Sequence, residues 1–117
     1  MNFSAQPTRR IASNLLWTSG GIVRNPLLTL GPDGRVLAVA SCPEPDGLAA
    51  TEFYSGLLVP DFPADYRTAF ERLCGNSATP LPELLAQTVT PGGVLVVISG
   101  LDYDSLRLTP ESLIRKL

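Results

Sequence analysis

Residues 51–66 read TEFYSGLLVPDFPADY, and this stretch decides the fold. The aromatic and aliphatic residues of its first half predict an extended strand, and Ser55 with Gly56 indicates a bulge or bend within it. Asp61 and Pro63 are typical of a helix start, because an acidic residue suits the positive end of the helix dipole and proline fits the first turn. The sequence therefore predicts that a buried strand gives way to a helix from Asp61 onward.

Two short helices are expected in the middle of the chain. The first carries apolar residues at i, i+3, i+4 and i+7, and these residues are Tyr66, Ala69, Phe70 and Leu73. Gly75 can close this helix in the left-handed region. The second helix is expected after Thr79 as its cap, with Pro80 in the first turn and Glu83 near the positive end. Together they predict a helical connector over about residues 61–90.

The parts of the chain before and after this connector predict strands. Ile11, Leu15 and Trp17 fall on one side of an extended segment over residues 9–17. The turn GPDG at residues 31–34 predicts a hairpin, since proline presets the first bend and glycine supplies a positive φ. Near the other end, VLVVIS at residues 94–99 predicts a buried strand, whereas residues 110–117 fit either a strand or a helix.

These elements predict a mainly β domain of the α+β class. We expect a small antiparallel composite β-sandwich or pseudo-barrel built from both chain ends, with the two short helices in the middle. The 117 residues, of which 44% are hydrophobic, suit a single domain over residues 1–117 with a real core.

Composition limits the partners and the location. The net charge of -2 and the scattered basic residues make nucleic acid an unfavourable partner. No apolar run approaches the roughly 18 residues needed to cross a bilayer, and the N-terminus lacks an apolar signal core, so a cytoplasmic protein is expected. Cys42 and Cys74 are too few for a disulfide framework and are expected to be buried or incidental thiols; whether they approach one another stays open.

The absence of histidine from the sequence restricts its chemistry. It excludes Ser-His-Asp and Cys-His nucleophile systems and the usual zinc sites. Asp102 and Asp104 superficially resemble the start of a calcium loop, but the glycine and the closing glutamate of that motif are missing. A polar turn with Asx-type hydrogen bonds is favoured there. No catalytic, cofactor-binding or metal-binding residue is therefore assigned, and no cofactor is expected.

Asp61, Asp65 and Tyr66 are the candidate pocket residues that remain. The two aspartates are four positions apart and could share one helical face, where burial of one carboxyl would allow acid and base roles. Two acids at a helix start are more often capping and dipole residues, so this interpretation is the alternative one. Further side chains that could line a pocket, but are more often core, are Trp17, Glu52 and Tyr54.

The order of segments resembles the amidohydrolase superfamily, in its chlorohydrolase and cytosine-deaminase-like branch. TEFYSGLLVPDF at residues 51–62 is similar to the strand that leads into the barrel of those enzymes, and GPDGRVLAV at residues 31–39 is similar to their opening hairpins. PLPELLAQTVTPGG at residues 80–93 looks like their late helix, and residues 94–117 resemble their closing strands. The resemblance implies a composite β-domain in which the two chain ends fold together.

The resemblance also implies that the catalytic barrel is missing. In the family a metal-binding (β/α)-barrel lies between the two ends, and its first histidines would fall near Tyr66 and Thr68, which are poor substitutes for imidazole. The implied protein is not an enzyme but a barrel-less remnant that acts as an interaction or assembly module. A homo-oligomer or a protein partner would cover the apolar surface left by the barrel.

Two alternatives to this function stay open. One is a small-ligand-binding protein or minor enzyme that uses carboxylates near Asp61 and Asp65. The other is a remnant with no independent role.

Overall fold

The computed structural model describes residues 9–32, 35–41 and 51–117, which form a mainly β domain of the α+β class. Its strands and helices are β1 (Arg9–Thr18), β2 (Gly21–Arg24), β3 (Pro26–Leu30), β4 (Val36–Ser41), β5 (Thr51–Phe62), α1 (Tyr66–Cys74), α2 (Leu81–Thr88), β6 (Val94–Ser99) and β7 (Leu113–Lys116). The predicted fold class is confirmed, and the segment that fitted either a strand or a helix contains the strand β7.

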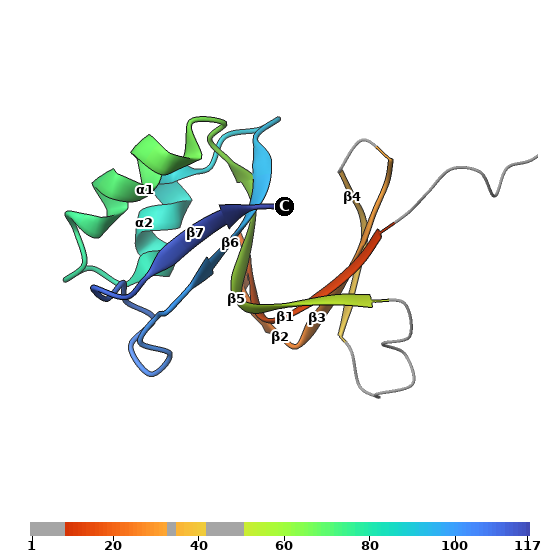
Figure 1. Cartoon of the computed structure of the whole chain (residues 1–117), viewed down its shortest axis with the longest axis horizontal. Helices are drawn as coiled ribbons and strands as arrows, with labels where there is room; N and C mark the ends of the chain where they lie inside the picture. The colour runs from red at the N-terminus through yellow and green to blue at the C-terminus, as the bar shows by residue number, and fades with distance from the viewer. Residues whose placement is uncertain (1–8, 33–34, 42–50) are drawn as a thin grey trace, which may run out of the picture.

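A single sheet joins the two ends of the chain. In the described residues its strand order is β4-β3-β1-β5-β6-β7, with β2 beside the second half of β1 (Figure 1). β5 is the joint, because it pairs with β1 on one side and with β6 on the other. The pairing of β1 with β5 is parallel and the other pairings are antiparallel, so the sheet is mixed rather than wholly antiparallel.

The expected interruption of β5 at Ser55 and Gly56 is a β-bulge. Ser13 pairs with Tyr54 and the next paired residues are Leu15 and Leu57, so two residues of β5 oppose Asn14. Gly56 adopts a φ of 133°, and its N–H donates to the Asn14 side-chain oxygen over 2.9 Å. A Cβ on Gly56 would lie 2.3 Å from the carbonyl oxygen of Ile98, so only glycine allows β6 to approach β5 this closely.

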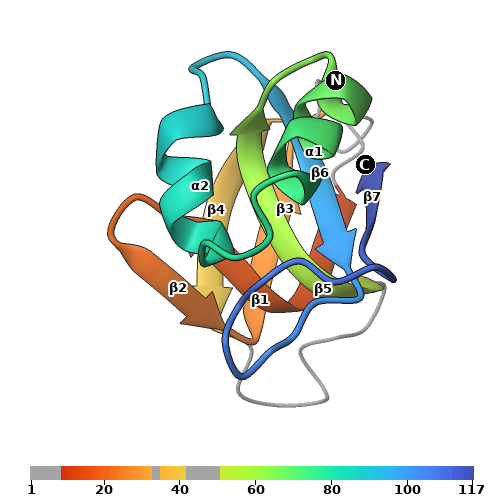
Figure 2. The ribbon, with the colours of Figure 1, turned by 90° about the vertical axis from the view of Figure 1, so that its left-hand side faces the viewer.

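The apolar core consists of two clusters, one on each face of the sheet. The first lies between the sheet and the two helices, which cover the same side of β5 and β6 (Figure 2), and includes Leu57, Phe62, Phe70 and Leu85. The second, which contains no helix residue, includes Leu28, Leu58 and Val97. Residues of both chain ends contribute to each cluster, so the sheet has apolar side chains on both faces.

Two expectations, one about the face of a strand residue and one about the end of a strand, are wrong. Ile11 packs in the second cluster whereas Leu15 and Trp17 pack in the first, so the face that β1 presents to each cluster changes near Asn14, opposite the bulge in β5. The strand β5 continues to Phe62, since Phe62 still pairs with Val94 of β6.

The helix boundaries shift accordingly. Asp61 lies inside β5 with a φ of 59°, and α1 begins at Tyr66 with Asp65 as its N-cap residue. Pro80 is the N-cap of α2 rather than a first-turn residue, while Glu83 lies in the first turn of α2 as expected. The predicted hairpin is confirmed by the pairing of β3 with β4, although residues 33 and 34 of its turn lie outside the described residues.

Candidate functional site

The three candidate residues named from the sequence lie in different surroundings. Asp61 is exposed in β5, whereas Asp65 is exposed at the start of α1 and its side chain makes no capping hydrogen bond. They therefore do not share a helical face, because only one of them belongs to the helix end. Tyr66 is half-buried against the first core cluster, and the Arg67 guanidinium lies 5.7 Å from the centre of its ring.

Asp61 lines a cleft of about 650 Å³ near the C-terminus of the chain, which we call the C-terminal cleft. Its walls come from the start of β4, the end of β5, the start of β6 and the end of β7, and its charged residues are Arg35, Asp61 and Lys116. Asp65 and Tyr66 line neither this cleft nor the one described next. Neither of these two clefts brings Asp61 and Asp65 together.

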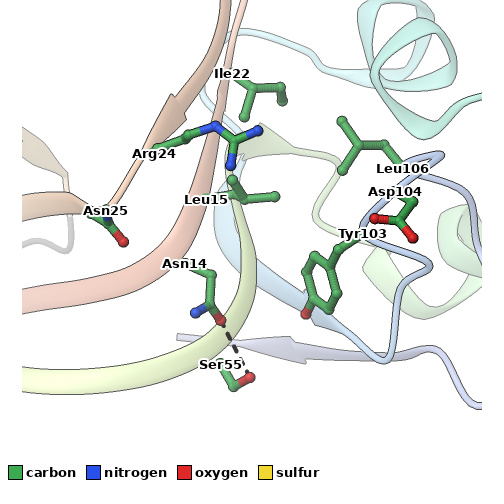
Figure 3. Close-up of a pocket in the computed structure, with 9 residues that line it drawn as sticks. All are labelled: Asn14, Leu15, Ile22, Arg24, Asn25, Ser55, Tyr103, Asp104 and Leu106. Carbon is green, nitrogen blue, oxygen red and sulfur yellow. Dashed lines mark hydrogen bonds between the residues drawn. The ribbon is translucent and has the colours of Figure 1, made fainter.

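A second cleft, of about 680 Å³, lies beside the β-bulge, and we call it the bulge cleft (Figure 3). It lies between the β1–β2–β5 region on one side and the loop over residues 101–107 on the other. Its lining residues are Asn14, Leu15, Ile22, Arg24, Asn25, Ser55, Tyr103, Asp104 and Leu106. Three aliphatic side chains and six polar ones therefore meet in a space large enough for a small ligand.

One wall of the bulge cleft is built by the bulge itself. The Asn14 side-chain oxygen accepts hydrogen bonds from the Gly56 N–H at 2.9 Å and the Ser55 hydroxyl at 3.4 Å, which fixes the amide at the wall. Asn25 follows β2 with a φ of 49°, and its N–H donates to the backbone oxygen of Asn14 over 2.9 Å. Arg24 extends from the end of β2 into the cleft, and its guanidinium makes no ion pair with any described residue (Figure 3).

The opposite wall is a loop held by its own hydrogen bonds. The Asp102 carboxylate accepts from the N–H groups of Asp104 at 3.0 Å and Ser105 at 3.3 Å, as in the predicted Asx turn. These hydrogen bonds, with that of Ser105 first, hold the pKa of Asp102 below its usual value. The backbones of Asp102 and Arg107 pair with each other, and the Leu106 carbonyl accepts from the N–H of Leu81 at 2.7 Å. The loop is thereby anchored to the start of α2.

Tyr103 and Asp104 stand on this loop and face Arg24 across the cleft (Figure 3). Both are exposed, so their side chains are accessible to a ligand. Over residues 9–32, 35–41 and 51–117, no three Asp, Glu, Cys or His side chains are grouped closely enough to hold a metal ion. The polar chemistry of the cleft is therefore that of amides, hydroxyls, one guanidinium and one carboxylate.

The other notable surface is the part of the sheet that lies away from the helices (Figure 1), which we call the wing. It consists of residues 9–13, 26–30, 36–41 and 51–55. Three large apolar side chains are exposed on it: Leu37 at 63%, Val39 at 48% and Phe53 at 60%. In the described residues β4 pairs with β3 alone, so its outer edge has no neighbouring strand there.

A polar network connects the wing to the C-terminal strand. Arg9 donates two 2.8 Å hydrogen bonds to the Glu52 carboxylate, and the Tyr54 hydroxyl donates a third at 2.8 Å. These bonds, with that of Arg9 first, lower the pKa of Glu52 to about 2, and the bond to Glu52 raises the pKa of Tyr54. The Arg115 guanidinium of β7 lies 5.4 Å from the centre of the Tyr54 ring. Glu52 and Tyr54 thus serve in this network and line neither cleft.

Comparison with family models, with curated proteins and with solved structures finds no match for this chain. Within the described part of the chain, no helix is long and apolar enough to cross a membrane. Whether Cys42 approaches Cys74 lies outside what the structure describes, because Cys42 is not among the described residues, while Cys74 is a free, exposed thiol.

Sequence reasoning did not select the residues of the bulge cleft. The signals were nevertheless present: Asn25 before Pro26 marks an irregular strand end, and Asp102 marks a rigid polar turn. Each signal predicts a local bend, but neither shows that the two bends face each other.

Proposed function

We propose that this chain is a non-catalytic assembly module, related to the composite β-domain of the amidohydrolase superfamily and lacking its barrel. The relationship is supported by β5, which joins strands from both chain ends in one sheet, and by the short helical connector that occupies the place of a barrel. The module acts by self-association, and its site of association is the outer edge of β4. The observation that carries the proposal is the apolar, uncharged character of this edge strand.

Edge strands offer unpaired N–H and C=O groups to other chains, and proteins usually protect them with charges or proline. β4 reads VLAVAS and contains neither. A bulge near Leu37 interrupts its pairing with β3, but residues 38–41 keep a regular register with β3. This leaves a short apolar strand whose outer edge is suited to a further strand.

A second copy of the chain is the partner that this strand fits best. Two β4 strands related by a two-fold axis pair in antiparallel fashion and continue the sheet across the dimer. Because β4 carries no charge, self-pairing places no like charges opposite each other. The exposed side chains of Leu37 and Val39 are then covered by the β4 side chains of the second copy. The contact is small, so we expect a Kd on the order of micromolar.

The experiment is sedimentation velocity of the wild-type chain and of Leu37→Lys and Val39→Lys at roughly 10 to 100 μM, above the expected micromolar Kd. Leu113→Lys is the matched control, because Leu113 is 68% exposed on β7 at the opposite edge of the sheet. We expect a wild-type dimer, a dimer of the control and monomers of both β4 variants. Circular dichroism spectra that match the wild type ensure that each variant is folded.

A wild-type chain that stays monomeric over this range would overturn the proposal. A dimer that survives both β4 substitutions would also overturn it, since the association would then use another surface.

A further inference from the structure

We infer that the bulge cleft is a binding site for a short peptide with free ends, of about two or three residues. This inference goes beyond self-association, because no residue of β4 lines the cleft. In the proposed complex the carboxylate of the peptide lies against Arg24 and its ammonium group against Asp104.

The charges of the two walls select the class of ligand. Arg24 projects from the β2 wall and Asp104 from the loop wall, and no ion pair joins them in the described structure (Figure 3). A ligand with a single negative charge would be attracted by Arg24 and repelled by Asp104. A cation would be attracted by Asp104 and repelled by Arg24. A ligand that carries a carboxylate at one end and an ammonium at the other satisfies both walls, and its guanidinium–carboxylate contact can be bidentate.

The volume of the cleft limits the length of the ligand. Arg24 and Asp104 form no ion pair with each other in the described structure, so both remain available to the two ends of a ligand. Each residue of an extended chain adds about 3.5 Å, so two or three residues give roughly 7 to 10 Å between the terminal charges. A volume of about 680 Å³ also accommodates a ligand of that size.

The groups between the charged ends match a peptide backbone and its side chains. The side-chain amide of Asn14 is held at the wall by its oxygen, which accepts from Gly56, and its NH2 group remains available to donate to a peptide carbonyl. Asn25 supplies a second amide next to Arg24. Leu15, Ile22 and Leu106 form an apolar surface for small aliphatic side chains, beside the exposed Tyr103 ring.

Both walls are rigid before a ligand arrives, which lowers the entropic cost of binding. The bulge and its Asn14 hydrogen bonds hold the first wall. The Asx turn at Asp102 and the bond from Leu81 to the Leu106 carbonyl hold the second. The two walls come from opposite ends of the chain, and the contact of β5 with both β1 and β6 fixes their relative position.

The test is an NMR titration of the full-length, nitrogen-15-labelled chain with trialanine that has free ends. Two further probes are N-acetyl-trialanine, which lacks the ammonium, and trialanine amide, which lacks the carboxylate. We expect trialanine to shift the amide signals of cleft residues, and each capped probe to bind about tenfold more weakly, as for the loss of a hydrogen bond to a charged group.

Two variants assign each end of the peptide to a wall. Arg24→Gln should bind trialanine and trialanine amide equally, and Asp104→Asn should bind trialanine and N-acetyl-trialanine equally. Asp65→Asn and Arg72→Gln are controls, since both residues are exposed and lie outside the cleft, and they should behave as the wild type.

Several results would overturn the inference. One is the absence of cleft shifts at about 10 mM trialanine, well above a millimolar Kd. Another is equal wild-type binding of the free and both capped probes, which would show that the terminal charges are not recognised. Neither result bears on dimerisation through β4, which is measured separately on the variants of that strand.

Discussion

Gly56→Ala is expected to remove a large part of the stability of the fold. Gly56 lies at the bulge where β1, β5 and β6 meet, with a φ of 133° that L-residues rarely adopt. An added Cβ would lie 2.3 Å from the backbone oxygen of Ile98 and 3.1 Å from the Cα of Ser99. Because these are backbone atoms of a paired strand, no side-chain rotation can relieve the contact.

The magnitude has two parts. Backbone strain at a positive φ costs about 1 to 3 kcal/mol. Relief of the contact with Ile98 requires β6 to move by about 1 Å, which weakens one or two ladder hydrogen bonds at about 0.5 to 1.5 kcal/mol each. The total is about 1.5 to 6 kcal/mol, compared with a free energy of unfolding of about 5 to 15 kcal/mol for a typical domain.

Urea unfolding monitored by tryptophan fluorescence measures this loss. Trp17, the single tryptophan, is 8% exposed in the first core cluster, so its emission reports the packing of the sheet against the helices. With a slope of about 1.5 kcal/mol per molar urea, the urea concentration at the unfolding midpoint should fall by about 1 to 4 M.

Substitutions at two other glycines separate the effect of backbone strain from that of a close contact with a neighbouring strand. Gly21 has the same φ of 133°, but a Cβ added there would meet no atom within 4 Å. Gly21→Ala should therefore lower the free energy of unfolding through backbone strain alone. Gly93→Ala would place its Cβ 2.2 Å from the backbone oxygen of Phe62, whereas the φ of Gly93 lies outside the left-handed region. This variant should therefore lower the free energy of unfolding through the close contact alone. If Gly56→Ala is no more destabilising than Gly21→Ala, the reasoning about the close approach of β6 is refuted.

Three further outcomes are expected. The folded-state pKa of Glu52, about 2 against an ordinary 4.5, means that its interactions stabilise the fold fully above pH 4.5 and lose effect as the pH falls toward 2. The difference in urea midpoint between wild type and Glu52→Gln should therefore be smaller at pH 3 than at pH 7, and a constant difference would contradict this. Partial desolvation, with a smaller contribution from the Glu71 charge, raises the pKa of the Cys74 thiol. In a Cys42→Ser background its alkylation rate should therefore reach half-maximum at a higher pH than that of cysteine in an unstructured peptide, and an equal or lower midpoint would disagree. Asn14→Ala should cost about 1 to 2 kcal/mol because the Gly56 N–H loses its acceptor, whereas Asn14→Asp should recover most of it; equal unfolding midpoints for the two variants would rule out this role.

Local patterns predicted several elements correctly because the necessary information lies within a few residues. The spacing of Ala69, Phe70 and Leu73 predicts the face of α1 that is buried. The β-branched run of β6 predicts a strand that the structure buries on both faces. The bulge was also expected from Ser55 and Gly56, since a glycine inside a strand is typical of a bulge or a close backbone approach.

The end of β5 could not be predicted in the same way. Asp61 and Pro63 have the residue types of a helix start, yet Asp61 is strand because its carbonyl accepts from the Thr90 N–H at 2.8 Å and Phe62 pairs with Val94. The partners of these groups lie beyond both helices, and local propensity contains no information about them. The predicted helix therefore starts several residues too early.

The sequence by itself determined a mainly β domain with two short amphipathic helices, because hydrophobic periodicity and turn residues act over short distances. Tertiary structure alone decided that β1 and β5 run parallel, that the core forms two clusters, and that Arg24 and Asp104 line one cleft. Parallel pairing leaves no short hairpin signal, and the cleft joins segments from opposite ends of the chain. Such features arise from packing between segments that are far apart in the sequence, so local residue patterns contain no information about them.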